Sequence, residues 1–180
     1  MDLKVLEAGL AAIIKPVHEN DQTEGSFLNY VGKIFRRGGL PYECPSGSYR
    51  YALKVSDIYG DNKWLGKDKN AWAVAYHATS LKNALSIVEN GFDFSKCKRN
   101  KFGDGMYTPS PEHALNNYGV EFECDNKKYK LIIQVRIDYA NLGPENIKSV
   151  EQTGRGVEYW IATDKEQIRP YGICIYPLNN

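Results

Sequence analysis

A run of alternating apolar side chains in the second half of the chain constrains the fold more than any other feature. The members of this run are Tyr129, Leu131, Ile133, Val135 and Ile137. Apolar residues at every second position indicate a β-strand with one face against a core. Ile132 makes part of the opposite face apolar as well, which is typical of strands buried on both faces. The run therefore predicts a central, largely buried strand.

Further short β-type runs, separated by turn residues, fill the chain after Gly39. They are Tyr49–Val55, Ala71–His77, Val157–Ala162 and Tyr171–Tyr176. The segment Cys124–Lys128 has the composition of a hairpin tip, because Asp125-Asn126 is a favourable turn pair. We therefore expect several short strands, at least two of which are joined by a tight turn.

Two short helices are predicted between these strands. Ser80 can cap the first helix and Gly91 can end it. In the second helix Ser110 can serve as the cap, and Pro111 suits the first helical position. Strands outnumber helices after residue 40 and their connections vary in length. This organisation favours the α+β class over a doubly wound parallel sheet.

Helical spacing appears twice before residue 40. The first pattern, which stops at Pro16, comprises Leu3, Leu6, Leu10, Ile13 and Ile14. The second pattern, which stops at Gly38-Gly39, comprises Phe27, Leu28, Val31, Ile34 and Phe35. We expect residues 1–46 to form a helical segment packed on a core of residues 47–180, because 180 residues is the usual size of one domain.

Composition disfavours several classes of function. The formal net charge is +1, which argues against strong general attraction to nucleic acid. No uninterrupted apolar stretch approaches the length of a membrane helix, and the first residues lack the pattern of a signal peptide. Cys44, Cys97, Cys124 and Cys174 lie outside metal-ligand spacing. We therefore expect no metal and no membrane, and an intracellular compartment, cytoplasmic or nuclear.

Three segments carry residues that are candidates for catalysis or ligand binding. The first is a strand that ends in His77-Ala78-Thr79, and the second is a glycine-rich stretch that runs through Gly105-Met106-Tyr107. The third is the apolar strand that contains Glu158. Each has an ordinary structural interpretation when taken alone: a capping histidine, a tight turn, or a charge at a strand edge. The Gly103-x-Gly105 pair is not a dinucleotide fingerprint, because the third glycine is absent.

Taken together and in this order, the segments resemble the catalytic domain of the poly(ADP-ribose) polymerase family. That family has a strand ending His-Gly-Ser/Thr, a stretch running into Gly-Ile-Tyr, a short helix ending in Tyr, and a late strand Glu-Tyr-Ile/Val. The matching positions are His77-Ala78-Thr79, Gly105-Met106-Tyr107, Tyr118 and Glu158-Tyr159-Trp160-Ile161. The resemblance implies the ADP-ribosyltransferase fold, in which two packed, mostly antiparallel sheets surround an NAD cleft with short flanking helices.

The resemblance also implies the activity of an NAD⁺-dependent ADP-ribosyltransferase. Such an enzyme cleaves the nicotinamide–ribose bond of its co-substrate NAD⁺ and transfers ADP-ribose to a protein or another acceptor, without a metal. The catalytic residues would be His77, Tyr107 and Glu158. The residues that bind NAD⁺ would be His77, Ala78, Thr79, Lys101, Gly105, Tyr107 and Tyr118.

The resemblance gives individual roles to these residues. Tyr107 and Tyr118 would hold the nicotinamide ring between them. The carboxylate of Glu158 would hydrogen-bond the 2′-hydroxyl of the nicotinamide ribose and stabilise the charge that develops there. His77 and Thr79 would bind the adenosine ribose, and the backbone of Ala78 would bind the carboxamide.

Two departures from the family pattern keep other functions open. Ala78 stands where the family has Gly, and Leu115 stands where it commonly has a Ser that contacts the carboxamide. One alternative is therefore a catalytically weak or inactive module that binds NAD or ADP-ribose. Another is an RNA 2′-phosphotransferase on the same scaffold, although that chemistry favours Arg and His around phosphates. The acceptor, and the choice between one ADP-ribose unit and a polymer, also stay open.

Overall fold

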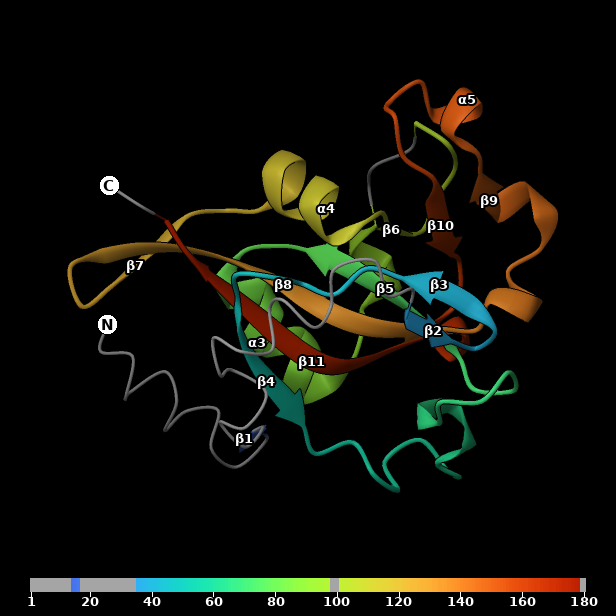
Figure 1. Cartoon of the computed structure of the whole chain (residues 1–180), viewed down its shortest axis with the longest axis horizontal. Helices are drawn as coiled ribbons and strands as arrows, with labels where there is room; N and C mark the ends of the chain where they lie inside the picture. The colour runs from blue at the N-terminus through green and yellow to red at the C-terminus, as the bar shows by residue number, and fades with distance from the viewer. Residues whose placement is uncertain (1–13, 17–34, 98–100, 179–180) are drawn as a thin grey trace.

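The computed structural model describes residues 14–16, 35–97 and 101–178. These residues form an α+β fold (Figure 1). The largest sheet has six strands in the order β1-β4-β11-β8-β5, with β7 paired to β8. Their bounds are β1 Ile14–Pro16, β4 Tyr49–Leu53, β5 Ala73–Ala78, β7 Phe122–Cys124, β8 Lys127–Ile137 and β11 Ile168–Pro177. Every strand pair among the described residues is antiparallel, which confirms the predicted class.

A second sheet and a hairpin complete the β-structure of the described residues. The second sheet has the order β6-β10-β9, and β2 pairs with β3 in the hairpin. The bounds are β2 Phe35–Arg37, β3 Leu40–Tyr42, β6 Met106–Thr108, β9 Ile147–Lys148 and β10 Tyr159–Ala162. The helices are α3 Leu81–Asn90, α4 Pro111–Tyr118 and α5 Val150–Thr153. None of them combines the length and apolar character needed to cross a bilayer.

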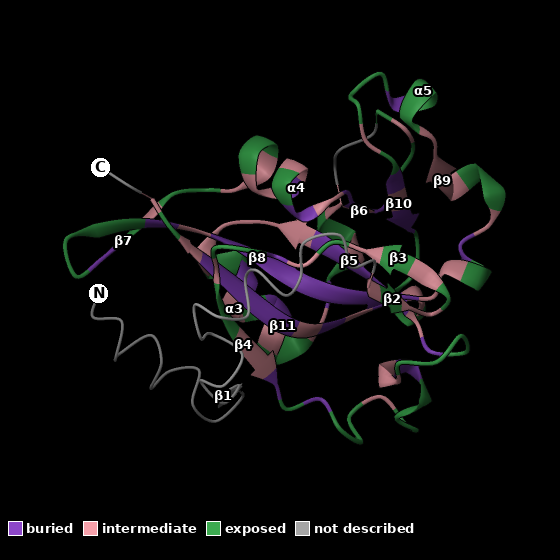
Figure 2. Ribbon diagram, viewed as in Figure 1, coloured by how far each residue is buried: buried purple, intermediate pink, exposed green. Residues whose placement is uncertain are grey.

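Strand β8 is the central buried strand that the alternating run predicts (Figure 2). It pairs with β5 on one side and with β11 on the other. Ile133 belongs to a core cluster that includes Ala84 and Ile87 of α3, whereas Ile132 belongs to a cluster that includes Ala114 of α4. The two helices therefore cover opposite faces of the sheet, which explains why both faces of β8 are apolar.

Local sequence signals fix both helices and one hairpin. The Ser80 hydroxyl accepts a hydrogen bond from the backbone N–H of Asn83 at 3.3 Å, and α3 ends at Gly91 as predicted. Ser110 caps α4 and Pro111 is its first residue, also as predicted. Asp125 and Asn126 both have positive φ, the geometry of a two-residue hairpin turn, so the predicted tip between β7 and β8 is confirmed.

Two residues of the predicted N-terminal helical patterns lie in strands. Ile14 begins β1, which pairs with β4, and Phe35 begins β2. The Gly38-Gly39 pair, predicted to stop a helix, is the turn of the β2–β3 hairpin, and both glycines have positive φ. The remaining members of the two patterns lie outside the described residues. Helical spacing was misleading at Phe35 because the glycine turn gives residues 35–37 a neighbouring strand to pair with.

A buried arginine of the main sheet forms hydrogen bonds with the connection before β5. The Arg136 guanidinium donates to the carbonyl oxygens of Trp72 at 2.6 Å, Leu65 at 3.0 Å and Gly66 at 3.2 Å. Arg136 lies on β8 opposite Val74 of β5. These bonds satisfy carbonyls that would otherwise be unpaired beside the core, and they fix where β5 begins.

Candidate active site

A cavity of about 640 Å³ lies where the C-terminal end of β5, the first turns of α3 and the loop before β6 meet. This volume is typical of sites for small organic ligands. Seven of the eight predicted site residues line the cavity: His77, Ala78, Thr79, Lys101, Gly105, Tyr107 and Tyr118. Residues from three separated segments of the sequence therefore converge on one hollow.

His77 connects the main sheet to the smaller sheet. It lies near the end of β5 opposite Ile133, and its half-buried ring packs edge-on against Phe92 with centroids 5.5 Å apart. The ring atom Nδ1 is 3.3 Å from the backbone oxygen of Tyr107 in β6. The imidazole therefore links β5 to β6, and these two strands form two walls of the cavity.

Helix α3 presents a polar stripe to the cavity. Asn83 and Ser86, which sequence reasoning did not select, line the cavity together with Thr79. The Asn83 side chain donates to the Thr79 hydroxyl at 3.2 Å. The spacing of these residues, close to one helical turn, was the available signal, because residues three or four apart share a helix face. The stripe offers hydroxyl and amide groups to a ligand that is rich in hydroxyls.

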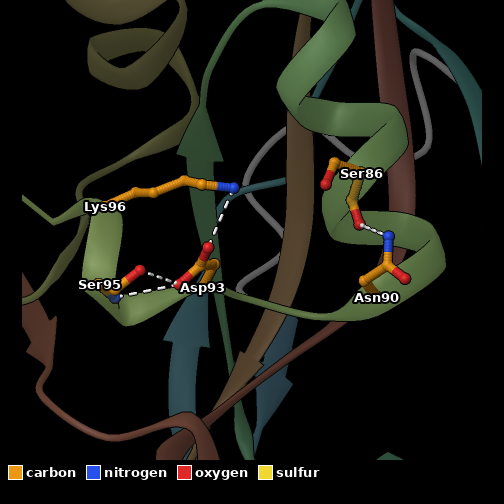
Figure 3. Close-up of polar contacts among 5 residues, drawn as sticks. All are labelled: Ser86, Asn90, Asp93, Ser95 and Lys96. Atoms are coloured by element: carbon orange, nitrogen blue, oxygen red, sulfur yellow. Dashed lines mark hydrogen bonds and ion pairs between the residues drawn. The ribbon is translucent and has the colours of Figure 1, made fainter.

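The end of the cavity beyond α3 carries an ion pair that the sequence did not predict (Figure 3). The Asp93 carboxylate lies 3.0 Å from the Lys96 ammonium and accepts from the Ser95 hydroxyl at 2.6 Å. Hydrogen bonds from Ser95 and then from Lys96 lower the pKa of the Asp93 carboxyl. Asp93 and Lys96 both line the cavity.

Positive charge exceeds negative charge around the cavity. Lys96, Lys101 and Arg155 are the cationic residues among those that line it, and Asp93 is the acidic one. A concave surface with such an excess attracts anions such as phosphate groups. Arg155 gave no sequence signal, because it lies in a loop without regular spacing.

Tyr107 closes the glycine-rich loop that precedes it. Its hydroxyl donates to the carbonyl of Gly103 at 2.6 Å and accepts from the backbone N–H of Phe102 at 2.9 Å. The Lys101 ammonium lies 5.1 Å from the centroid of the Phe102 ring. The predicted pair Lys101 and Tyr107 is therefore held in one compact loop at the cavity wall.

Gly105 brings this loop against β10. Its φ is +155°, and a Cβ placed there would lie 2.5 Å from the Ala162 carbonyl oxygen and 2.6 Å from Cγ2 of Ile161. A side chain at this position therefore collides with the backbone of the neighbouring strand. The glycine permits the close approach that lets β6 pair with β10.

We expect Gly105→Ala to lower the free energy of unfolding by about 1–3 kcal/mol, because the added methyl forces β6 away from β10. Gly103→Ala is the matched control, since Gly103 also has positive φ but open space around its Cα. Both variants carry backbone strain, so the difference between their urea unfolding curves measures the collision. Equal losses in the two variants would contradict the assignment of a close approach at Gly105.

Tyr159 is a buried hub behind the cavity wall. Its hydroxyl lies 2.8 Å from Nε2 of His113 and 2.7 Å from the hydroxyl of Tyr118. The Tyr118 hydroxyl in turn accepts from the Arg155 guanidinium at 3.0 Å. The ring of Tyr159 packs edge-on against that of Tyr107, with centroids 5.8 Å apart. Sequence reasoning selected Tyr118 but did not foresee this connected set.

Glu158 is the predicted residue that the structure does not place at the cavity. Its side chain is exposed and accepts a hydrogen bond from the indole N–H of Trp160. Successive residues of an extended chain point to opposite sides, so Glu158 and Trp160 share one side while Tyr159 points to the other, toward His113 and Tyr118. The carboxylate therefore lies directly before β10, outside the cavity lining.

The residues that depart from the family pattern have defined surroundings. Leu115 is half-buried and packs with Ala78 against the core cluster of Val74 and Tyr76. Its side chain belongs to this apolar cluster and not to the cavity lining. His113 does not replace the missing serine directly, because its Nε2 is engaged with Tyr159.

No group of three or more potential metal ligands occurs among residues 14–16, 35–97 and 101–178. A scan against protein-family models finds no matching family, and a search of curated proteins finds no matching sequence.

Proposed function

We propose that this protein is an NAD⁺-dependent ADP-ribosyltransferase with the ADP-ribosyltransferase fold. The observation that carries the proposal is the convergence on one cavity of seven of the eight predicted residues, which come from residues 77–79, residues 101–107 and Tyr118. An α+β arrangement of antiparallel sheets that meet at this cavity is compatible with that fold. An accidental likeness of short motifs gives no reason for their side chains to meet.

The lining of the cavity suits the chemical parts of a dinucleotide. Lys96, Lys101 and Arg155 provide cations for a pyrophosphate. The hydroxyl and amide groups of Thr79 and Asn83 suit ribose hydroxyls, and His77 provides ring nitrogens on the same wall. Tyrosine rings provide flat surfaces for a cationic aromatic ring, where stacking and cation–π attraction act together.

The proposed reaction needs orientation and charge stabilisation from the protein. Bound NAD⁺ supplies an ADP-ribosyl group joined to a pyridinium ring. When this bond breaks, its electron pair goes to the ring, which leaves as neutral nicotinamide, and the acceptor bonds to the ribose in its place and loses its proton. Tyr107 and Tyr118 hold the leaving group, and the backbone N–H and C=O of Ala78 bind its carboxamide. The Glu158 carboxylate accepts a hydrogen bond from a ribose hydroxyl and stabilises positive charge that develops at the ribose, as carboxylates do in glycoside cleavage. To do so, its side chain leaves the indole N–H of Trp160 and turns toward the cavity.

A second candidate is a module of the same fold that binds NAD or ADP-ribose without turnover. Two observations favour it: the Glu158 carboxylate rests on Trp160 outside the cavity lining, and Leu115 packs into an apolar cluster. The two candidates differ in one measurable property, the release of nicotinamide.

The experiment that tests the proposal combines calorimetric titration with NAD⁺ and an assay of free nicotinamide from labelled NAD⁺. Binding together with release supports the transferase, binding without release supports the module, and the absence of both contradicts the proposal. The carrier of the label then identifies the acceptor, and its size distinguishes one unit from a polymer.

We expect His77→Ala to weaken NAD⁺ binding by roughly tenfold, which is the typical cost of losing a hydrogen-bonding group in a binding site. Lys82→Ala is the matched control, because Lys82 is exposed on α3 and does not line the cavity. The titration is repeated on both variants. A loss of affinity that is equal in the two would mean that NAD⁺ binds elsewhere.

A further inference from the structure

An unbroken series of hydrogen bonds runs from the cavity to a half-buried position on α4. It begins at the Arg155 guanidinium, passes through the hydroxyls of Tyr118 and Tyr159, and ends at Nε2 of His113. The three donor–acceptor distances are 3.0, 2.7 and 2.8 Å. Arg155 and Tyr118 line the cavity, whereas Tyr159 is fully buried and His113 is half-buried. The Arg155 end of the series thus lines the cavity, whereas the His113 end does not.

The donors and acceptors at the two ends of the series restrict the direction of each hydrogen bond in it. A guanidinium has donors and no acceptor, so the Tyr118 oxygen must accept from Arg155. A neutral imidazole whose Nε2 carries no proton accepts from Tyr159, and Tyr159 then accepts from Tyr118. A protonated imidazole must donate, so it reverses both hydroxyls, and Tyr118 then accepts from Tyr159 as well as from Arg155. The proton of the Tyr118 hydroxyl then has to point elsewhere.

We propose that His113 is a positioning residue that determines, through Tyr159, whether the Tyr118 hydroxyl presents a lone pair or a proton to the ligand in the cavity. With His113 neutral and its ring proton on Nδ1, both hydroxyl protons point along the series toward the imidazole, and the cavity receives a lone pair. With His113 protonated, the series reverses and the cavity receives a hydrogen-bond donor.

The charges around His113 favour the neutral arrangement at neutral pH. Burial first, and the nearby Arg155 cation second, lower the pKa of His113 below its ordinary value. The titratable and charged groups that face it are Tyr159 from β10, Tyr118 from its own helix, and Arg155 from the loop before β10. The positive charge of Arg155 also orients the hydroxyl dipoles with their protons away from it, toward His113.

The two arrangements favour different ligands. In the proposed function the backbone C=O and N–H of Ala78 bind one N–H and the oxygen of the carboxamide, so the second N–H is left for a lone pair on Tyr118. A carboxylate has an oxygen at that place and matches a hydroxyl proton instead. This step rests on the proposed function, in which Tyr118 holds the nicotinamide ring. The series then discriminates NAD⁺ from its nicotinic acid analogue, which differs in having a carboxylate in place of the carboxamide. A mismatch leaves a polar group unsatisfied, so we expect a preference of roughly tenfold.

The sign of the pH dependence follows from these assignments. As the pH falls through the pKa of His113, Tyr118 becomes a donor and the preference for the carboxamide declines. By linkage, NAD⁺ binds the neutral form better and lowers the pKa of His113 further, and the nicotinic acid analogue raises it. Both effects vanish when the series is interrupted at Tyr159.

The test measures dissociation constants of NAD⁺ and of its nicotinic acid analogue between about pH 5 and pH 8. In the wild type the ratio of the two constants should change roughly tenfold in favour of the carboxamide as the pH rises. His113→Gln can accept and donate but does not titrate, so its ratio should not vary with pH. Tyr159→Phe should also give a constant ratio although His113 still titrates.

The matched control is Glu112→Gln, which removes a charge beside His113 on an exposed position of α4 and should keep the wild-type dependence. A wild-type ratio that does not vary with pH, or one that still varies in Tyr159→Phe, overturns the inference while leaving the proposed function intact.

A measurement without ligand separates the two proposals. The His113 ring is titrated by NMR and assigned by its disappearance in His113→Gln. The series requires the pKa of His113 to change in both Tyr159→Phe and Tyr118→Phe. If neither dinucleotide binds, the proposed function fails, and an unchanged pKa in both variants would overturn the series as well.

Discussion

Replacement of Glu158 by Gln is expected to lower the rate of nicotinamide release by about 100-fold or more and to leave NAD⁺ affinity nearly unchanged. Loss of a single group that stabilises charge in a transition state typically has an effect of this size. The amide keeps the shape of the side chain but removes its negative charge. Because the side chain is exposed and outside the cavity lining, little binding energy should depend on it.

Single-turnover release of labelled nicotinamide, with affinity measured separately, checks this expectation. Glu166→Gln is the matched control, since Glu166 is an exposed acid on the connection between β10 and β11. Full activity of Glu158→Gln would remove this carboxylate from the mechanism. A large loss of NAD⁺ affinity would instead show that the carboxylate already contacts the bound dinucleotide in its ground state.

Truncation of Ile133 to Ala is expected to lower the free energy of unfolding by about 2–5 kcal/mol. Ile133 has no exposed surface and lies in the middle of β8, between His77 of β5 and Ile173 of β11. The truncation removes buried apolar atoms and leaves a cavity where three strands meet. Because strands on both sides fix the backbone, the surroundings cannot collapse fully into the space.

Urea unfolding of the variant beside the wild type measures the loss. Ile58→Ala is the matched control, because Ile58 is 64% exposed and its truncation should change stability by less than about 0.5 kcal/mol. A loss below about 1 kcal/mol at Ile133 would mean that this position is not part of a tightly packed core.

Local signals made much of the fold predictable. The alternation around Ile133 predicted the central strand, and serine caps predicted the first residues of α3 and α4. The Asp125-Asn126 turn predicted the β7–β8 hairpin. In each case residues close together in the sequence determine the local structure. The convergence at the cavity was predictable to the extent that the resemblance placed His77, Tyr107 and Tyr118 together.

Features that depend on distant partners were not predictable in the same way. Strand β6 is three residues long and forms because Gly105 allows it to approach β10. Phe35 lies in a strand because a hairpin partner is present, although its spacing was helical. The direction of the Glu158 side chain depends on Trp160, and the series from Arg155 to His113 joins a loop, a strand and a helix. No local sequence pattern predicts these contacts between distant residues.

The position of β11 in the sheet has a consequence for how the protein is made. Residues 168–177 lie between β4 and β8, so they join segments separated from them by long stretches of chain. During translation, β4 and β8 emerge well before the strand that separates them. Until the ribosome has released residues 168–177, both strands have unpaired edges that can bind chaperones or other nascent chains. We therefore expect the main sheet to be completed only after residues 168–177 have emerged, because its central strand pairs join distant parts of the chain.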